Sequence, residues 1–217
     1  MLASNDYKDF IDQISDACST NPGLTTFSKD GVPGLRGTIE LYDDHHAFVD
    51  SYSIAILATD GFPRDFPLVF ETGNKIPKNY DWHVYETDGH CCIKTIPEEM
   101  LACKKGITLN SFIETEIKPY LFNQTFRRVN GYFYQERSHG LTGWIEYFKE
   151  VFKTANPKTI VDGLKFVSKN EKPNRSALCF CGSGIKYRKC HREAYENLSK
   201  LSPSDFDLIF SAIGIKP

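Results

Sequence analysis

The sequence lacks the features that mark secreted, membrane-spanning and nucleic-acid-binding proteins. Its start, MLASNDYKDF, has no basic region followed by an apolar run, and no stretch approaches about 18 consecutive apolar residues. Neither sign of charge dominates, because 26 Lys and Arg stand against 28 Asp and Glu, for a formal net charge of −2. We therefore expect a cytoplasmic protein with no membrane partner, and the charge balance argues against nucleic acid as a partner.

The chain also lacks an internal repeat, a low-complexity tract and the evenly spread cysteines of a secreted disulfide domain. It has seven cysteines, an odd number, and four of them stand in two tight groups, Cys91-Cys92 and Cys179-x-Cys181. In a reducing compartment such groups serve as metal ligands, as nucleophiles or as core residues. The 217 residues, of which 41% are hydrophobic, are enough to bury at least one sizeable core.

Hydrophobic periodicity predicts an α+β protein with one small antiparallel sheet. Apolar residues recur at helical spacing in the ranges 7–18, 109–121, 141–152 and 160–167. Stretches rich in β-branched and aromatic residues, separated by polar or Gly-Pro turns, lie at 35–42, 49–59 and 67–72. We expect Pro119 to kink the helix over 109–121 or to end it early. His45 and His46 have no third ligand nearby, so they are interpreted as residues of a solvated loop.

A polar, proline-containing segment, SKNEKPNRS at residues 168–176, predicts a boundary before a cysteine-rich tail. We expect three parts on this basis. The first is a domain over residues 1–155, the second is a helical and polar connector over 156–172, and the third is a tail over 173–217.

The tail holds three thiols and an imidazole within thirteen residues, at Cys179, Cys181, Cys190 and His191. Four such ligands are what a closed, tetrahedral Zn²⁺ site requires. Two glycines between the second and third ligands let the backbone reverse tightly. Basic side chains around the ligands could offset the negative charge of three thiolates on one zinc ion; they are Lys186, Arg188, Lys189 and Arg192.

This string of residues closely resembles the SEC-C motif, a small zinc-binding segment at the ends of the SecA translocation ATPase and many other bacterial proteins. The resemblance places His191 in the last ligand position and implies a structural Zn²⁺ with a docking or recognition role, since such a site has no open position for catalysis. The tail is too short to bury a core alone, so we expect metal binding to supply its folding energy. A third hypothesis is that the basic residues of the tail make a weak contact with nucleic acid, which the overall negative charge disfavours.

The stretch from Phe62 to Ile93, FPRDFPLVFETGNKIPKNYDWHVYETDGHCCI, resembles the ubiquitin-conjugating (UBC) fold. In that fold a helix, a strand meander and a proline-rich turn lead to a His-Pro-Asn tripeptide and then to a Gly-x-x-Cys that bears the active thiol. His83 matches the histidine, and Gly89 and Cys92 match the Gly-x-x-Cys. The resemblance implies a UBC-like domain with Cys92 as its catalytic nucleophile.

The pair Cys91-Cys92 raises the question of which thiol reacts. Adjacent side chains of an extended segment point to opposite sides, so we expect one of the two to be buried, and the resemblance leaves Cys91 as that neighbour. A free cysteine is roughly 3% thiolate at neutral pH and needs only modest activation. His83 and His90 are both close enough in sequence to stabilise the thiolate or carry a proton. Cys103, in a Cys-Lys-Lys loop, is the alternative thiol.

The chain departs from the UBC pattern at the tripeptide, which here reads His83-Val84-Tyr85. The family's Asn, which stabilises the oxyanion formed when an amine attacks the thioester, is absent. Efficient transfer to lysine therefore requires that His83, Tyr85 or His90 supply the donor, because losing such a donor costs about 10² to 10³ in rate.

A UBC-like domain joined to a SEC-C tail is similar to the stand-alone conjugating enzymes of bacterial cyclic-oligonucleotide antiviral (CBASS) operons. The resemblance implies a thioester between Cys92 and the C-terminus of a partner protein. The expected partner is a cyclic-oligonucleotide synthase, which the transfer would prime for antiphage defence. The alternative hypothesis is a catalytically inactive UBC-like adaptor that docks partners through its groove and its zinc tail.

Overall fold

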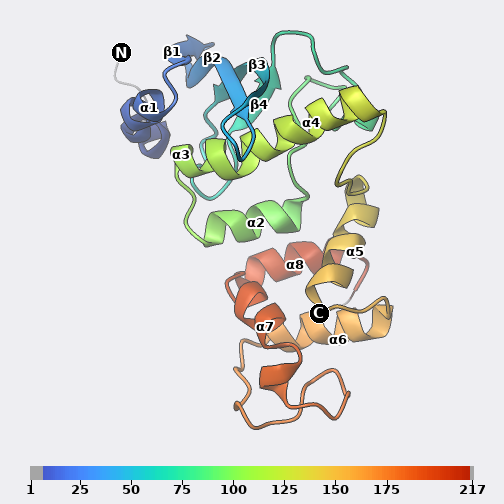
Figure 1. The fold of residues 1–217 in the computed structure, drawn as a ribbon. Helices are drawn as coiled ribbons and strands as arrows, with labels where there is room; N and C mark the ends of the chain where they lie inside the picture. Colours follow the sequence, from blue (N-terminus) through green and yellow to red (C-terminus); the bar gives the residue numbers. More distant parts are fainter. Residues whose placement is uncertain (1–6, 216–217) are drawn as a thin grey trace. The chain divides into compact units, whose positions relative to one another are not determined.

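The computed structural model describes residues 7–215 and divides them into two compact units. The first unit comprises the residues up to Lys94 together with Gly106–Glu136, and the second comprises Thr95–Lys105 together with the residues from Arg137 on. The sheet and several helices make up the first unit, whereas the second is built from helices and turns (Figure 1). The α+β class is confirmed. Every helix within residues 7–215 falls short of the length and apolar character that a bilayer crossing requires.

The first unit contains a four-stranded antiparallel sheet in the order β1-β2-β3-β4. The strands are β1 (Leu24–Lys29), β2 (Val32–Tyr42), β3 (Phe48–Leu57) and β4 (Leu68–Glu71). The three strands expected from the sequence are confirmed as β2, β3 and β4. Strand β1 was missed because Leu24 is its only buried residue, so the apolar alternation that marks a half-buried strand is absent.

One face of the sheet is buried, and helix α4 (Lys118–Asn130) packs against β2 and β3. Inward residues pair across the strands, with Leu35 opposite Ile56 and Ile39 opposite Tyr52. The hydroxyl of Tyr52 lies 2.8 Å from Oγ1 of Thr125 on α4, so a hydrogen bond joins the sheet to the helix inside the core. Helix α4 is thereby held in place against the sheet, and the segment around His83 in turn hydrogen-bonds to this helix.

Helix α1 (Lys8–Thr20) packs against β1 and against α3 (Leu109–Phe112), the start of the long helical stretch predicted from residue 109. A π-helical segment, η3 (Ile113–Ile117), follows α3 and leads directly into α4. Pro119 lies in the first turn of α4, where a missing N–H is tolerated, and the helix continues to Asn130 instead of ending early. The expected early end is therefore wrong, and the irregular segment of this helical stretch is η3, which precedes Pro119.

The chain between β4 and His83 is ordered by two polar side chains. The buried carboxylate of Glu71 accepts a hydrogen bond of 2.8 Å from the backbone N–H of Gly73. The side chain of Asn79 then caps the short helix η2 (Tyr80–Trp82). These hydrogen bonds satisfy backbone N–H groups of the loop between β4 and His83. They thereby hold in place the residues that precede His83.

The second unit is an all-helical core. Its elements are α2 (Ile96–Lys104), α5 (Gly140–Val151), α6 (Pro157–Ser168), η4 (Tyr187–Lys189), α7 (Arg192–Leu198) and α8 (Pro203–Ala212). Large buried side chains from all six of these elements, and from Phe152, belong to one hydrophobic cluster; examples are Leu101, Phe148, Phe152, Leu164, Tyr187, Leu198 and Phe210.

The two compact units follow a different division from the three parts expected from the sequence. The expected connector, residues 156–172, contains α6, whose Leu164 and Val167 are fully buried in the same cluster as Tyr187 of the tail. Helices α5 and α6 each have an apolar face that needs cover, and the tail supplies it. The tail therefore shares a hydrophobic core with α5 and α6.

Candidate functional site

The first candidate site is a short antiparallel pairing within residues 83–92, called the cysteine hairpin below. Val84 and Cys91 form an antiparallel bridge at its centre. Hydrogen bonds flank the bridge on both sides, from Tyr85 N–H to His90 O (2.9 Å) and from Cys92 N–H to His83 O (2.7 Å). Opposite residues of such a pair share a face, and successive pairs alternate between faces. The bridge pair Val84 and Cys91 therefore points one way, and the other face carries Tyr85, His90 and Cys92.

Cys91 lies on the buried face of the hairpin. Its side chain is 6% exposed, and its backbone N–H donates a 2.7 Å hydrogen bond to the carbonyl of Val69 in β4. Burial raises the pKa of the Cys91 thiol to about 12. The expectation that one of the two cysteines is buried is confirmed, and Cys91 is a protonated core residue.

Cys92 lies on the opposite, partly exposed face, and His83 lies beside it. A ring nitrogen of His83 is within 4.8 Å of the Cys92 sulfur. The carbonyl of His83 accepts hydrogen bonds from Cys92 N–H and from the hydroxyl of Tyr120 (3.0 Å), while the preceding carbonyl of Trp82 accepts one from Gln124 Nε2 (2.9 Å). Tyr120 and Gln124 both belong to α4, so the core helix fixes the position of the His83 turn.

His90 occupies the same face of the hairpin as Cys92 but has a different partner. Its Nδ1 lies 2.6 Å from Oδ1 of Asp88, and its backbone N–H donates to the same oxygen at 3.2 Å. Its ring stacks on Tyr85 with centroids 4.1 Å apart and an interplanar angle of 21°. Partial burial raises the pKa of Asp88, but hydrogen bonds from His90 outweigh this and lower it.

Sequence reasoning did not identify three residues of this site, although two signals were present. Tyr120 and Gln124 are polar residues four apart on an otherwise apolar helical face, a spacing that brings both to one side of a helix. Asp88 precedes His90 by two residues in a tight turn.

Cys103, the alternative thiol, is buried on α2 in the second unit.

The second candidate site brings together the four predicted metal ligands of the tail. One donor atom from each of Cys179, Cys181, Cys190 and His191 lies within 4.8 Å of all the others, so the group could hold a metal ion. Nδ1 of His191 is 3.3 Å from the sulfur of Cys179 and 3.2 Å from that of Cys190, and the sulfurs of Cys181 and Cys190 are 3.6 Å apart. A tetrahedral zinc site with standard bond lengths has edges of roughly 3.5 to 3.8 Å, so a small expansion would fit the ion.

A glycine turn brings the ligands together. Gly182 and Gly184 have φ values of +75° and +72°, a region that residues with a Cβ avoid, and they reverse the chain immediately after Cys181. The hydroxyl of Ser183, between them, lies 3.2 Å from the sulfur of Cys181 and accepts a hydrogen bond from the N–H of Ile185. The turn thus provides both the reversal and a polar group beside the sulfurs.

The imidazole of His191 has a hydrogen-bond partner at Nε2, the ring nitrogen that is not beside the cysteine sulfurs. Its Nε2 lies 2.7 Å from the carbonyl oxygen of Phe152, which can only accept a hydrogen bond, so the proton resides on Nε2 and Nδ1 is left as a metal ligand. The rings of Phe152 and Phe180 flank the imidazole, with centroids 5.9 and 5.4 Å away. The sequence gives no signal for the role of Phe152. Every residue type has a backbone carbonyl, and this one lies 39 residues away from His191 in the chain.

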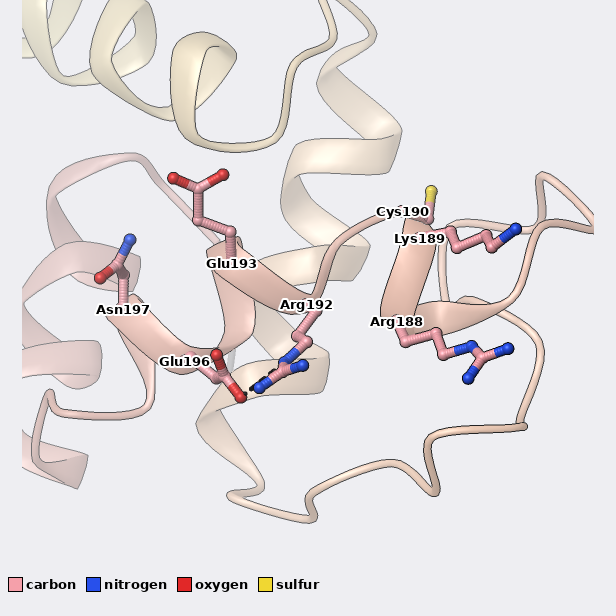
Figure 2. A pocket seen from close by; sticks show the side chains of 7 residues that line it. All are labelled: Arg188, Lys189, Cys190, Arg192, Glu193, Glu196 and Asn197. Atoms are coloured by element: carbon pink, nitrogen blue, oxygen red, sulfur yellow. Dashed lines mark hydrogen bonds and ion pairs between the residues drawn. The ribbon is translucent and has the colours of Figure 1, made fainter.

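A pocket of about 320 Å³ adjoins the metal-ligand group and is lined mainly by charged side chains (Figure 2). Its lining residues are Arg188, Lys189, Cys190, Arg192, Glu193, Glu196 and Asn197. Arg192 pairs with Glu196 at 2.9 Å, and Glu193 pairs with Lys153 at 3.2 Å. The acidic groups of the pocket are thus balanced, and Arg188 and Lys189 add positive charge beside Cys190.

Residues 175–193 match the SEC-C motif, which covers the four grouped ligands and the glycine turn. The match concerns this short part of the chain. None of the curated proteins compared with the chain matches it.

Proposed function

We propose that the first unit is a ubiquitin-conjugating-like transferase whose Cys92 carries the C-terminus of a partner protein as a thioester. The observation that carries this proposal is the opposed placement of the two cysteines. Cys91 is buried and protonated, whereas Cys92 is partly exposed with an imidazole nitrogen of His83 within 4.8 Å. The order of α1, a four-stranded meander and the cysteine hairpin supports a UBC-like fold for this unit.

The loading step follows from these positions. The sulfur of Cys92 attacks the carbonyl carbon of an activated C-terminus, such as an acyl adenylate or a thioester on another protein, and a C–S bond forms. The activating group leaves with the electron pair of its own bond to that carbon. The thiol proton passes to the imidazole of His83 or to water. Exchange between activated acyl groups and a thiol needs little beyond this positioning.

The partner and the setting are proposed from the combination of a UBC-like unit with a SEC-C segment. We place the reaction in the bacterial cytoplasm and propose a cyclic-oligonucleotide synthase of an antiviral operon as the protein joined through its C-terminus. The SEC-C match at residues 175–193 supports the second half of this combination.

For the second unit we propose a structural Zn²⁺ held by Cys179, Cys181, Cys190 and His191. Three sulfurs and one imidazole form a donor set typical of zinc, and with all four in place the ion has no open position. When bound, zinc supplies a fixed cross-link between the glycine turn and His191. The hydrogen bond of His191 to Phe152 extends that cross-link to the end of α5.

The test is co-expression of the chain with the products of the genes that flank its own, followed by non-reducing electrophoresis and mass spectrometry. The proposal predicts an adduct that thiols release, present in Cys91→Ala and Cys103→Ala and absent in Cys92→Ala. Cys92→Ser should trap an ester that resists thiols, because an alkoxide is a poorer leaving group than a thiolate. If no variant and no wild-type protein yields an adduct, the inactive adaptor is the better account.

A further inference from the structure

The cysteine hairpin contains a second imidazole whose geometry differs from that of His83. His90 Nδ1 lies 2.6 Å from a carboxylate oxygen of Asp88, and stacking on Tyr85 at 4.1 Å restrains the plane of the ring. An ionised carboxylate only accepts hydrogen bonds, so the neutral imidazole carries its proton on Nδ1. Nε2 is then the atom that can accept a proton. The His90 side chain is 23% exposed, so solvent and a reactant can reach it.

His90 and Cys92 are two residues apart on one extended segment, so they lie on the same face at a separation of roughly 7 Å between their Cα atoms. The bridge between Val84 and Cys91 fixes this alternation, because both of those side chains are buried on the other face. A group bound to the sulfur of Cys92 therefore lies on the side of the hairpin to which the His90 ring projects.

The two possible classes of acceptor make different demands on such a site. A thiol acceptor is partly ionised at neutral pH and exchanges with a thioester without much help. A primary amine is protonated, and it must lose a proton both before and after it attacks. The hairpin lacks the amide side chain that the UBC pattern places two residues after His83, since that position is Tyr85. Because the amine must lose its protons, a proton acceptor on the same face would assist it independently of that missing donor.

We propose that Asp88 and His90 form a proton-accepting pair for a primary amine acceptor, so that the thioester on Cys92 ends as an amide. This inference rests on the proposed function of Cys92. The amine nitrogen attacks the thioester carbonyl, a C–N bond forms, the C–S bond breaks, and Cys92 leaves as a thiolate. The amine attacks in its neutral form, after its ammonium proton has passed to water, and the second proton lost by the nitrogen passes to Nε2 of His90. Asp88 is a positioning residue, which holds the proton on Nδ1 and stabilises the imidazolium that forms.

A purely structural role for Asp88 makes a different prediction. The same carboxylate oxygen also accepts the backbone N–H of His90 at 3.2 Å, so the side chain could serve only to shape the turn. Loss of a turn contact would disturb Cys92 towards every acceptor alike. Loss of a base would slow amines and leave thiols unaffected.

The experiment starts from the full-length protein loaded at Cys92 with a short peptide thioester that ends in glycine, a chemical donor that needs no protein partner. Intact-protein mass spectrometry follows discharge of the peptide to free lysine and, separately, to 2-mercaptoethanol. We expect Asp88→Asn to slow discharge to lysine by about 10-fold or more and His90→Gln by about 10²-fold, with discharge to the thiol unchanged. Asp88→Glu should restore part of the lysine rate. Glu86→Gln, an exposed acid in the same turn, is the matched control and should match wild type.

The outcomes separate this inference from the proposal on which it rests. If wild-type Cys92 cannot be loaded, the transferase proposal itself fails. If Cys92 loads normally but Asp88→Asn and His90→Gln discharge to lysine at the wild-type rate, the proton-accepting pair is refuted. Equal slowing towards lysine and thiol in Asp88→Asn would also refute it, because that result assigns the carboxylate to the shape of the turn.

Discussion

The backbone N–H of Cys92 donates a hydrogen bond of 2.7 Å to the carbonyl oxygen of His83. The same oxygen accepts the Tyr120 hydroxyl at 3.0 Å, so one carbonyl joins both strands of the cysteine hairpin to helix α4. His83 itself has a left-handed backbone conformation, with φ of +52°, which is uncommon for a residue with a side chain. The position of the imidazole beside Cys92 therefore depends on contacts that the core helix provides.

Removing the Tyr120 hydroxyl should loosen this arrangement. We expect Tyr120→Phe to lower the free energy of unfolding of the first unit by about 0.5–1.5 kcal/mol, the usual net effect of one buried hydrogen bond. Amide hydrogen exchange at Cys92 should become faster by a similar free energy. Urea denaturation with exchange mass spectrometry measures both quantities.

Tyr132→Phe is the matched control, since Tyr132 is 63% exposed and loses the same hydroxyl. It should leave both stability and exchange at Cys92 unchanged. Equal effects of the two variants would contradict the role given to Tyr120.

Thiol reactivity should separate the neighbouring cysteines. With a pKa raised to about 12 by burial, Cys91 stays protonated at neutral pH and should resist iodoacetamide, while the partly exposed Cys92 is alkylated in the folded protein. Peptide mapping after brief labelling checks this prediction. Preferential labelling of Cys91 would mean that the two faces of the hairpin are assigned the wrong way round.

The raised pKa of Cys91 also has a consequence for stability in alkali. The unfolded chain releases the thiol proton near its ordinary pKa of about 8.5, whereas the folded protein keeps it until the pH approaches 12. The stabilising contribution is therefore complete below about pH 8.5 and declines as the pH rises from there towards 12. In Cys91→Ala this part of the decline should be absent, which denaturation curves across the alkaline range can measure.

Metal removal should affect the second unit beyond the ligands. We expect one Zn²⁺ per chain by elemental analysis, and less in Cys179→Ser. Since Tyr187 and His191 contact the helical core and Phe152, a strong chelator should speed hydrogen exchange in α5 and α6 as well as in the glycine turn. Exchange in the sheet of the first unit should not change. A wild-type protein that contains no zinc when purified in zinc-supplemented medium would contradict the assignment.

The shared core makes a further prediction about helix α8. Phe210 is 3% exposed within the cluster that includes α5 and α6, so Phe210→Ala should destabilise the second unit by about 3–5 kcal/mol. Leu208 lies on the same helix but is 44% exposed, and Leu208→Ala should stay within about 0.5 kcal/mol of wild type. Thermal unfolding compares the two. If α6 kept its exchange protection in Phe210→Ala, the tail would be independent of the helices, as the sequence had led us to expect.

The sequence predicted most of the elements that repeat an apolar pattern. Helices α1, α5 and α6 and strands β2 to β4 follow from spacing, because each buries one regular face. Helix α2 was missed although its start carries a capping box, with Thr95 and Glu98 bonded to each other at 2.6 Å. Its apolar residues are too few to form a stripe, so local chemistry was the available signal.

The candidate sites also contain parts that the sequence could predict and parts that it could not. The four metal ligands could be predicted because they stand close together in sequence with spacing that coordination chemistry explains. The supports for His83 and His191 could not, since the Tyr120 hydroxyl and the Phe152 carbonyl reach them from residues 37 and 39 positions away. The choice of His83 over His90 as the neighbour of Cys92 likewise required the pairing of the hairpin strands.

The most direct test of the central claim is to identify the residue that takes up an acyl group. Purified wild-type protein is incubated with a glycine-ended peptide thioester, and the adduct is mapped by mass spectrometry before and after treatment with hydroxylamine, which cleaves thioesters. The account predicts one adduct per chain, located at Cys92, removed by hydroxylamine, retained in Cys103→Ala and lost in Cys92→Ala. An adduct at Cys91 or Cys103, or no adduct on a folded protein, would contradict it.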